Sequence, residues 1–217
     1  MLHSAPGKDR DNNAMNVFLV LVLLGIVAHL IKSAEQRQRI ALLSQQLQPY
    51  QLEKLIEQLT SGYLRALGES DPERSGPIWR MLEGTEKTLA DQLVQLASGL
   101  AAMNEADARV SLLPEWLPMT RRWLPSATFD LRKAISLHAR GFADGVQNAA
   151  RLSRKQQAFT LTAELFLFQH TCHWYCRSKP LASARLWARH QTRYEQVLGS
   201  VSKGTRAAYD ALVSGTP

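Results

Sequence analysis

Apolar residues are distributed unevenly along this chain, with one long run near the N-terminus and shorter helical stripes after it. From Ala14 to Ile31 the sequence reads AMNVFLVLVLLGIVAHLI and carries no formal charge. A helix of this length extends roughly 27 Å, close to the ~30 Å hydrocarbon thickness of a bilayer. The pattern therefore predicts a single transmembrane helix over 14–31. The alternatives are a cleaved signal peptide and a buried core helix.

The charges beside this run favour an uncleaved anchor and indicate its direction. Basic and acidic residues cancel before the run, whereas Lys32, Arg37 and Arg39 follow it against Glu35 alone. A signal peptide has the opposite arrangement, with positive charges first and small residues at the cleavage site. Because the side richer in Lys and Arg stays in the cytoplasm, we expect 32–217 to be cytoplasmic, at the inner membrane if the organism is bacterial. A start at Met15 would favour the same orientation.

Helical periodicity continues after the anchor and divides the chain into four parts. Residues 1–13 have no periodicity and are predicted to be a disordered leader, followed by the anchor at 14–31. Residues 32–48 are predicted to form a helical stalk, whose narrow stripe of Ile40, Leu43 and Leu47 suits packing on one neighbour or on a second copy of the chain. Residues 49–217 are expected to form a bundle of about six helices. Strand alternation is not evident, so the predicted fold class is all-α.

The expected bundle helices are 52–67, 78–103, 126–152, one from Ser153, one from Pro180 and a last piece at 205–213. Ser126 is expected to cap the third, and 69–77 (ESDPERSGP) is typical of a linker. The second helix carries a seam expected to pack inside this chain's own bundle: Leu82, Leu89, Leu93, Leu96, Leu100 and Met103. Residues 159–176 are apolar on all sides, which predicts a central buried helix. The helix from Pro180 is expected to bury Trp187, Tyr194, Leu198 and Val201.

Charge separates the two halves of this basic protein, whose net charge is +7. Residues 1–119 have 11 basic against 14 acidic residues, and residues 120–217 have 15 against 5. Arg185, Arg189 and Arg193 recur at spacings of four and could contact anionic lipid or nucleic acid, although such a row is usually a solvated helix face. Nucleic acid is the less expected partner, because no reading helix or aromatic platform is recognisable. The acidic residues of the first half are interpreted as solvated helix faces.

The segment 112–125, LLPEWLPMTRRWLP, is the leading candidate for a partner-binding surface. Its three prolines preclude a regular helix, and Trp-Leu-Pro occurs twice. Tryptophan beside arginine suits a protein interface or a membrane surface. The candidate residues are Trp116, Leu117, Arg121, Arg122 and Trp123. The alternative is a connection whose tryptophans cap the core.

His170, Cys172, His173 and Cys176 are the candidates for metal or thiol chemistry. Zinc accepts such ligands. On one helix, however, the four spread over about 160°, and the sequence offers no second His/Cys pair to complete a site. Polar groups satisfied within a core are therefore the favoured interpretation, as for His138 on the stripe of the third helix. Two cysteines are too few for a disulfide framework, and no metal or cofactor is predicted. Gly141 and Gly145 are expected to permit a close helix approach.

No phosphate loop, metalloprotease motif or nucleophile elbow occurs in the sequence. The leading hypothesis is a non-enzymatic, single-pass membrane scaffold or assembly subunit. Its partners would be membrane lipid through 14–31 and other proteins of a membrane complex, with self-association through the stalk a further option. The first alternative is a membrane-tethered module whose basic half binds anionic lipid or nucleic acid. The second is a thiol- or metal-dependent sensor or enzyme.

Overall fold

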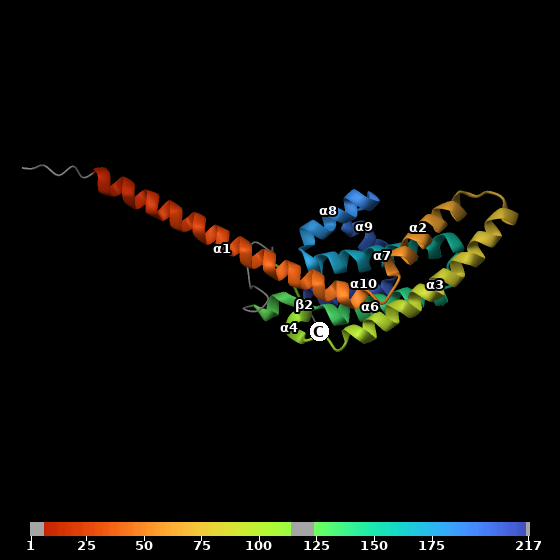
Figure 1. Ribbon diagram of the computed structural model, residues 1–217. Helices are drawn as coiled ribbons and strands as arrows, with labels where there is room; N and C mark the ends of the chain where they lie inside the picture. Colours follow the sequence, from red (N-terminus) through yellow and green to blue (C-terminus); the bar gives the residue numbers. More distant parts are fainter. Residues whose placement is uncertain (1–6, 114–123, 216–217) are drawn as a thin grey trace, which may run out of the picture.

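The computed structural model describes residues 7–113 and 124–215, and this part of the chain is almost entirely helical (Figure 1). The nine α-helices described are α1 Gly7–Leu47, α2 Leu52–Gly68, α3 Pro72–Leu100, α4 Glu105–Ala108, α6 Leu131–Gln147, α7 Arg154–Cys176, α8 Lys179–His190, α9 Tyr194–Ser200 and α10 Lys203–Ser214. Strands β1 Arg109–Ser111 and β2 Thr128–Asp130 pair antiparallel, and a 3₁₀ turn, Pro125–Ala127, precedes β2. The predicted all-α class is confirmed.

Helix α1 combines the predicted anchor and stalk in one continuous element. It begins at Gly7, so residues 7–13 are helical rather than a disordered leader. Once a helix has nucleated in the apolar run, adding residues at its end is propagation and has a low free-energy cost. Within the described residues, α1 is the one helix long and apolar enough to cross a membrane, and the bundle covers none of its apolar window. Figure 1 shows this N-terminal half projecting away from the bundle.

The stalk packs against the chain's own bundle. Leu43 is only 3% exposed and belongs to the main hydrophobic core. Two contacts join the stalk to the end of α7: Arg177 Nη1 donates to Gln36 Oε1 at 2.6 Å, and Arg39 Nη1 donates to the Tyr175 carbonyl at 3.2 Å. The apolar stripe of the stalk was expected to pack on one neighbour or on a second copy of the chain. In the structure it packs on the bundle of its own chain.

The core lies where α3, α6 and α7 meet. The leucines of the α3 seam are buried in it, and Met103 packs against it, as predicted. Gly141 and Gly145 permit the close approach expected of them, because a Cβ at Gly141 would overlap the Thr205 hydroxyl and a Cβ at Gly145 would press on Leu161. Helices α10 and α7 thus pack closely on α6. Helix α7 contacts helices on several sides, which agrees with its predicted central position.

Two helix starts differ from the sequence prediction, and both are explained by capping aspartates. Helix α3 begins at Pro72, within the expected linker, because Asp71 accepts a hydrogen bond from the Glu73 amide at 2.9 Å and proline suits the first helical turn. Helix α6 is capped by Asp130, which accepts from the Arg132 amide at 2.8 Å, rather than by Ser126. Helix α7, by contrast, begins at Arg154, close to the expected start near Ser153, and Ser153 is its N-cap.

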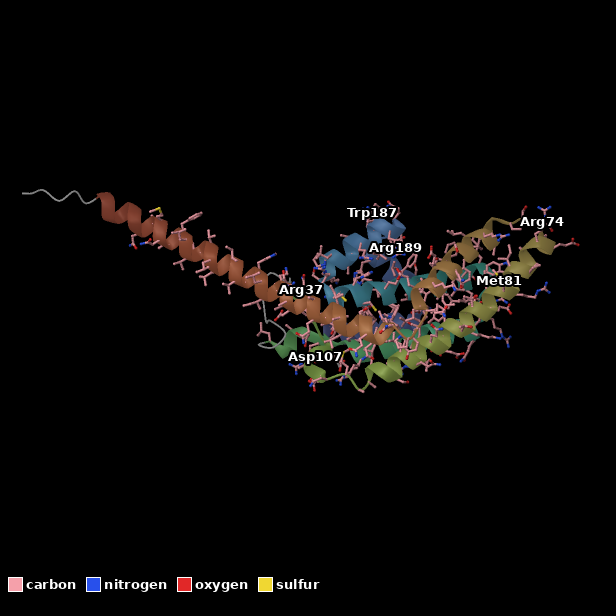
Figure 2. All side chains as sticks on the ribbon, in the orientation of Figure 1. Arg37, Arg74, Met81, Asp107, Trp187 and Arg189 are labelled. Atoms are coloured by element: carbon pink, nitrogen blue, oxygen red, sulfur yellow. The ribbon has the colours of Figure 1, made fainter. Side chains whose placement is uncertain are left out.

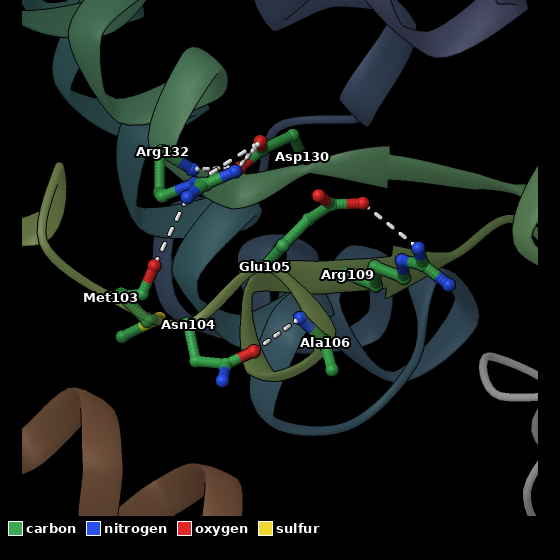
Figure 3. A network of polar contacts seen from close by, with 7 residues as sticks. All are labelled: Met103, Asn104, Glu105, Ala106, Arg109, Asp130 and Arg132. Atoms are coloured by element: carbon green, nitrogen blue, oxygen red, sulfur yellow. Dashed lines mark hydrogen bonds and ion pairs between the residues drawn. The ribbon is translucent and has the colours of Figure 1, made fainter.

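The β1–β2 pair was not predicted, because strands of three residues are too short to show alternation. Val110 lies opposite Phe129, and the Trp174 indole donates to the Ser111 carbonyl at 2.8 Å, which ties the sheet to α7. Figure 3 shows a second link, in which Arg132 pairs with Asp130 and also donates to the Met103 carbonyl at 3.0 Å. The sheet thus fixes both ends of the segment that contains the Trp-Leu-Pro repeats.

The helix expected from Pro180 is interrupted, which changes the position of Trp187. Helix α8 ends at His190, and Gln191 adopts a left-handed conformation with φ of 51°. Because the chain turns there, Trp187 no longer shares a face with Tyr194. Tyr194 is buried, as predicted, whereas Trp187 is 47% exposed (Figure 2), so the prediction for Trp187 was wrong.

Candidate functional site

A hollow of about 570 Å³ lies beside the stalk and is called the stalk cavity below. It is bounded by α1, α2, α7 and α8. Its lining includes the apolar residues Ile40, Leu43, Leu47, Leu52, Ile56 and Phe168, and the polar or reactive residues Glu53, Cys172, His173, Cys176, Arg177, Arg185 and Arg189. The cavity therefore has an apolar floor and a basic rim.

The rim contains two of the three arginines predicted to contact an anionic surface. Arg185 and Arg189 lie one turn apart on α8. Arg189 approaches Glu53 at 3.7 Å, but both side chains are exposed, so this ion pair contributes little. Arg193 follows the break at Gln191 and does not line the cavity. The predicted row of three is thus reduced to two arginines on α8, joined at the rim by Arg177 from the end of α7.

The structure divides the four candidate thiol and imidazole residues between two surroundings. Cys172, His173 and Cys176 line the stalk cavity. His170 instead lies beside Ser183, whose Oγ is 3.0 Å from Nε2, and its ring packs on Tyr194. Among the described residues, no group of three or more metal-ligating side chains is close enough to hold an ion. The four residues therefore do not form one metal site.

Burial determines the protonation of these groups. It raises the pKa of the Cys172 thiol and so disfavours the thiolate that nucleophilic chemistry requires. Burial, followed by repulsion from Arg185 and Arg189, lowers the pKa of His173 to about 4. His173 is thus a neutral imidazole at pH 7, next to a concentration of positive charge.

A second hollow of about 720 Å³ is lined by α2 and α7, with further residues from the end of α8 and from α9; we call it the α2–α7 groove. Its deeper lining includes buried Tyr63, Ala163 and Val197. Two large apolar side chains stand at its edges, Leu64 at 75% exposed and Phe159 at 56% exposed. Phe159 is an exception to the buried character expected of α7. Exposed apolar side chains beside a groove are typical of a surface that binds a partner.

A buried hydrogen-bonded chain joins α6, α7 and α10. His138 Nε2 is 2.9 Å from Thr171 Oγ1, which is 3.1 Å from the Tyr209 hydroxyl. Burial lowers the pKa of His138 to about 3, so this imidazole is neutral at pH 7. The prediction that His138 is a hydrogen-bonded core histidine is confirmed.

Glu86 is a buried acid, contrary to the prediction that the acidic residues of the first half form solvated helix faces. Glu86 accepts a hydrogen bond from the Tyr63 hydroxyl at 2.8 Å, and burial raises its pKa. Its spacing from Leu82 and Leu89 places it on the α3 seam, which was the available signal. Glu86 also borders a small cleft where Arg154 pairs with Glu83.

The residues predicted for partner contact lie outside the described part of the chain: Trp116, Leu117, Arg121, Arg122 and Trp123. Their assignment stays a prediction. The described flanks are held close together, because Ser111 pairs with Thr128 across the sheet. The chain as a whole has no significant match among known protein families, curated proteins or solved structures.

Proposed function

We propose that this protein is a non-enzymatic, single-pass membrane scaffold or assembly subunit, anchored by residues 14–31 with its bundle in the cytoplasm. The observation that carries the proposal is the continuity of α1, whose first half is apolar and uncovered and whose second half packs on the bundle through buried Gln36, Arg39 and Leu43. A domain attached in this way has a fixed orientation relative to the membrane. Fixed orientation suits a subunit that must present one surface to membrane-embedded partners.

The α2–α7 groove is the surface that we assign to a protein partner. Leu64 on α2 and Phe159 on α7 both line this hollow and are exposed. A groove between two helices can accept the apolar face of an amphipathic helix, with anchors spaced three or four residues apart. Arg189, His190 and Thr192 at the α8–α9 end would supply polar contacts at the edge of such an interface. The predicted Trp-Leu-Pro surface would be a second contact.

The test is recovery of companions from native membranes. The full chain, tagged at its C-terminus, is extracted in mild detergent and its stoichiometric companions are identified by mass spectrometry. The variant L64E/F159E should lose companions, because each glutamate would place a charge in an apolar contact. The matched control is Met81→Glu, since Met81 is 62% exposed on α3 and lies outside the groove (Figure 2). A parallel W116A/W123A variant tests the Trp-Leu-Pro surface separately.

Retention of the same companions by L64E/F159E would refute the groove assignment, and an equal loss in the Met81 variant would make the effect nonspecific. Absence of any stoichiometric companion from the unmodified chain would remove the scaffold proposal itself. The orientation is tested independently by adding a membrane-impermeant maleimide to intact cells. Cys176, which is partly exposed, should be labelled only after the cells are opened.

A further inference from the structure

The stalk cavity combines apolar side chains with a cluster of arginines. Residues from α1, α2 and α7 supply an apolar floor, and Arg177, Arg185 and Arg189 supply positive charge at its rim. Among its described lining residues, Glu53 is the one carboxylate, so three guanidinium groups face a single negative charge. A ligand that matches both sides has an apolar body and an anionic end.

The two arginines of α8 are suited to bind such an anion. Both are exposed and one helical turn apart, so they can converge on one carboxylate or phosphate. His173 also lines the cavity, and a neutral imidazole can donate a hydrogen bond. Burial, followed by repulsion from these two arginines, lowers the pKa of His173, so the imidazole is neutral at pH 7.

A second feature connects this cavity to the membrane. A smaller hollow along α1 is lined by His29, Leu30, Ser33, Gln36, Arg37, Ile40 and Arg177. It shares Ile40 and Arg177 with the stalk cavity, and Leu30 belongs to the predicted span. Along a helix, Ile40 lies only about 14 Å beyond Ile31. The two hollows thus follow the stalk from the end of the span to the arginines of α8.

We propose that the stalk cavity binds a single-chain anionic amphiphile drawn from the adjoining membrane leaflet, with its headgroup at Arg185 and Arg189 and its chain against the apolar face of the stalk. Its volume of about 570 Å³ suits a small ligand, since such sites measure ~300–1,000 Å³. The inference rests on the membrane anchoring in the proposed function, but it does not depend on a protein partner.

Cys176 provides the measurement, because it lines the cavity and becomes the only cysteine in a Cys172→Ser background. The full chain is placed in phosphatidylcholine vesicles, and the rate of Cys176 labelling by N-ethylmaleimide is followed. Oleate or lysophosphatidylglycerol should slow labelling, whereas neutral lysophosphatidylcholine and inorganic phosphate should not. Protection by oleate alone would identify a carboxylate site, and protection by lysophosphatidylglycerol alone would identify a phosphate site.

The variant R185Q/R189Q should require at least about tenfold more amphiphile for the same protection, because each charge-assisted hydrogen bond contributes on that scale. Arg193→Gln is the matched control and should behave like the unmodified chain. As an independent readout, oleate should raise the unfolding temperature of the unmodified chain but not that of Ile40→Trp, whose larger ring would fill the cavity. Equal unfolding temperatures without ligand would show that these variants fold.

Equal protection by lysophosphatidylcholine, protection by phosphate alone, or unchanged protection in R185Q/R189Q would each overturn the proposal. The result is separable from the scaffold function. Arg185 lines the stalk cavity but not the α2–α7 groove, so Arg185→Gln should weaken protection of Cys176 and retain the protein companions that L64E/F159E loses. L64E/F159E should in turn retain protection of Cys176. Loss of both properties in either variant would show that the two sites are not distinct.

Discussion

Replacement of His138 by glutamine should make the free energy of unfolding less dependent on pH in the acidic range. His138 is 1% exposed, and its Nε2 contacts the Thr171 hydroxyl. That hydroxyl also donates to the Leu167 carbonyl at 3.0 Å, so it accepts from Nε2, which must carry the proton. Nδ1 is then the unprotonated nitrogen, and it has no hydrogen-bond partner among the described residues. Protonation of Nδ1 would place a charge in the core without an acceptor.

The size of the effect follows from the two pKa values of His138. The pKa is about 3 in the folded chain, where burial and then nearby His170 lower it, and about 6.5 when unfolded. Between these values the unfolded state binds the additional proton, so stability is greatest above pH 6.5 and falls as the pH is lowered toward 3. From pH 7 to pH 5 this single group should reduce the free energy of unfolding by about 2 kcal/mol.

The assay is urea unfolding of the full chain in a neutral detergent, followed by tryptophan fluorescence at several pH values between 5 and 7. His170 and His173 also have lowered pKa values, whereas Glu86 and Glu164 have raised ones that oppose them. These contributions are common to both proteins and cancel in the comparison. The stability difference between the unmodified chain and His138→Gln should therefore change by about 2 kcal/mol between pH 7 and pH 5. Parallel stability curves would refute the neutral, buried imidazole.

Three further predictions concern packing and capping. Gly141→Ala should lower the unfolding temperature, because the new methyl group meets Thr205 and such overpacking costs ~1–3 kcal/mol. Gly84→Ala has open space around it and should stabilise the fold by up to about 1 kcal/mol. Thermal scans compare the two variants. Leu59→Ala should cost ~2–5 kcal/mol in urea unfolding because Leu59 is fully buried, and Leu64→Ala should stay within about 0.5 kcal/mol. Asp130→Ala should cost ~0.5–2 kcal/mol and accelerate hydrogen exchange at the start of α6; unchanged exchange there would exclude its capping role.

Local signals in the sequence were sufficient for the elements that depend on them. Helix α7 begins close to the expected start near Ser153, and α2 ends at Gly68, one residue beyond the expected end. The α3 seam was correctly assigned to the interior, because its leucines repeat over several helical turns. In each case a few neighbouring residues determine the outcome, so no information about tertiary packing was needed.

Features that depend on contacts between distant residues could not be predicted in this way. The position of Arg185 beside His173 is set by the angle at which α8 returns along α7, and the sequence gives no value for that angle. The break at Gln191 has no glycine or proline to announce it. The stalk stripe showed that Leu43 would be covered, but not by which surface, because a narrow apolar stripe fits its own bundle and a second copy equally well.

Because α1 is continuous, the number of residues in it determines which way the bundle faces around the helix axis. No glycine or proline interrupts the chain between Ile26 and Leu47, so the segment proposed to cross the membrane and the segment that packs on the bundle belong to one continuous helix. One residue inserted near Lys32 would rotate the bundle by about 100° about this axis while lifting it only ~1.5 Å. Every groove would remain intact but would face a different direction in the plane of the membrane. In the proposed orientation, a neighbouring membrane protein would therefore meet a different side of the bundle.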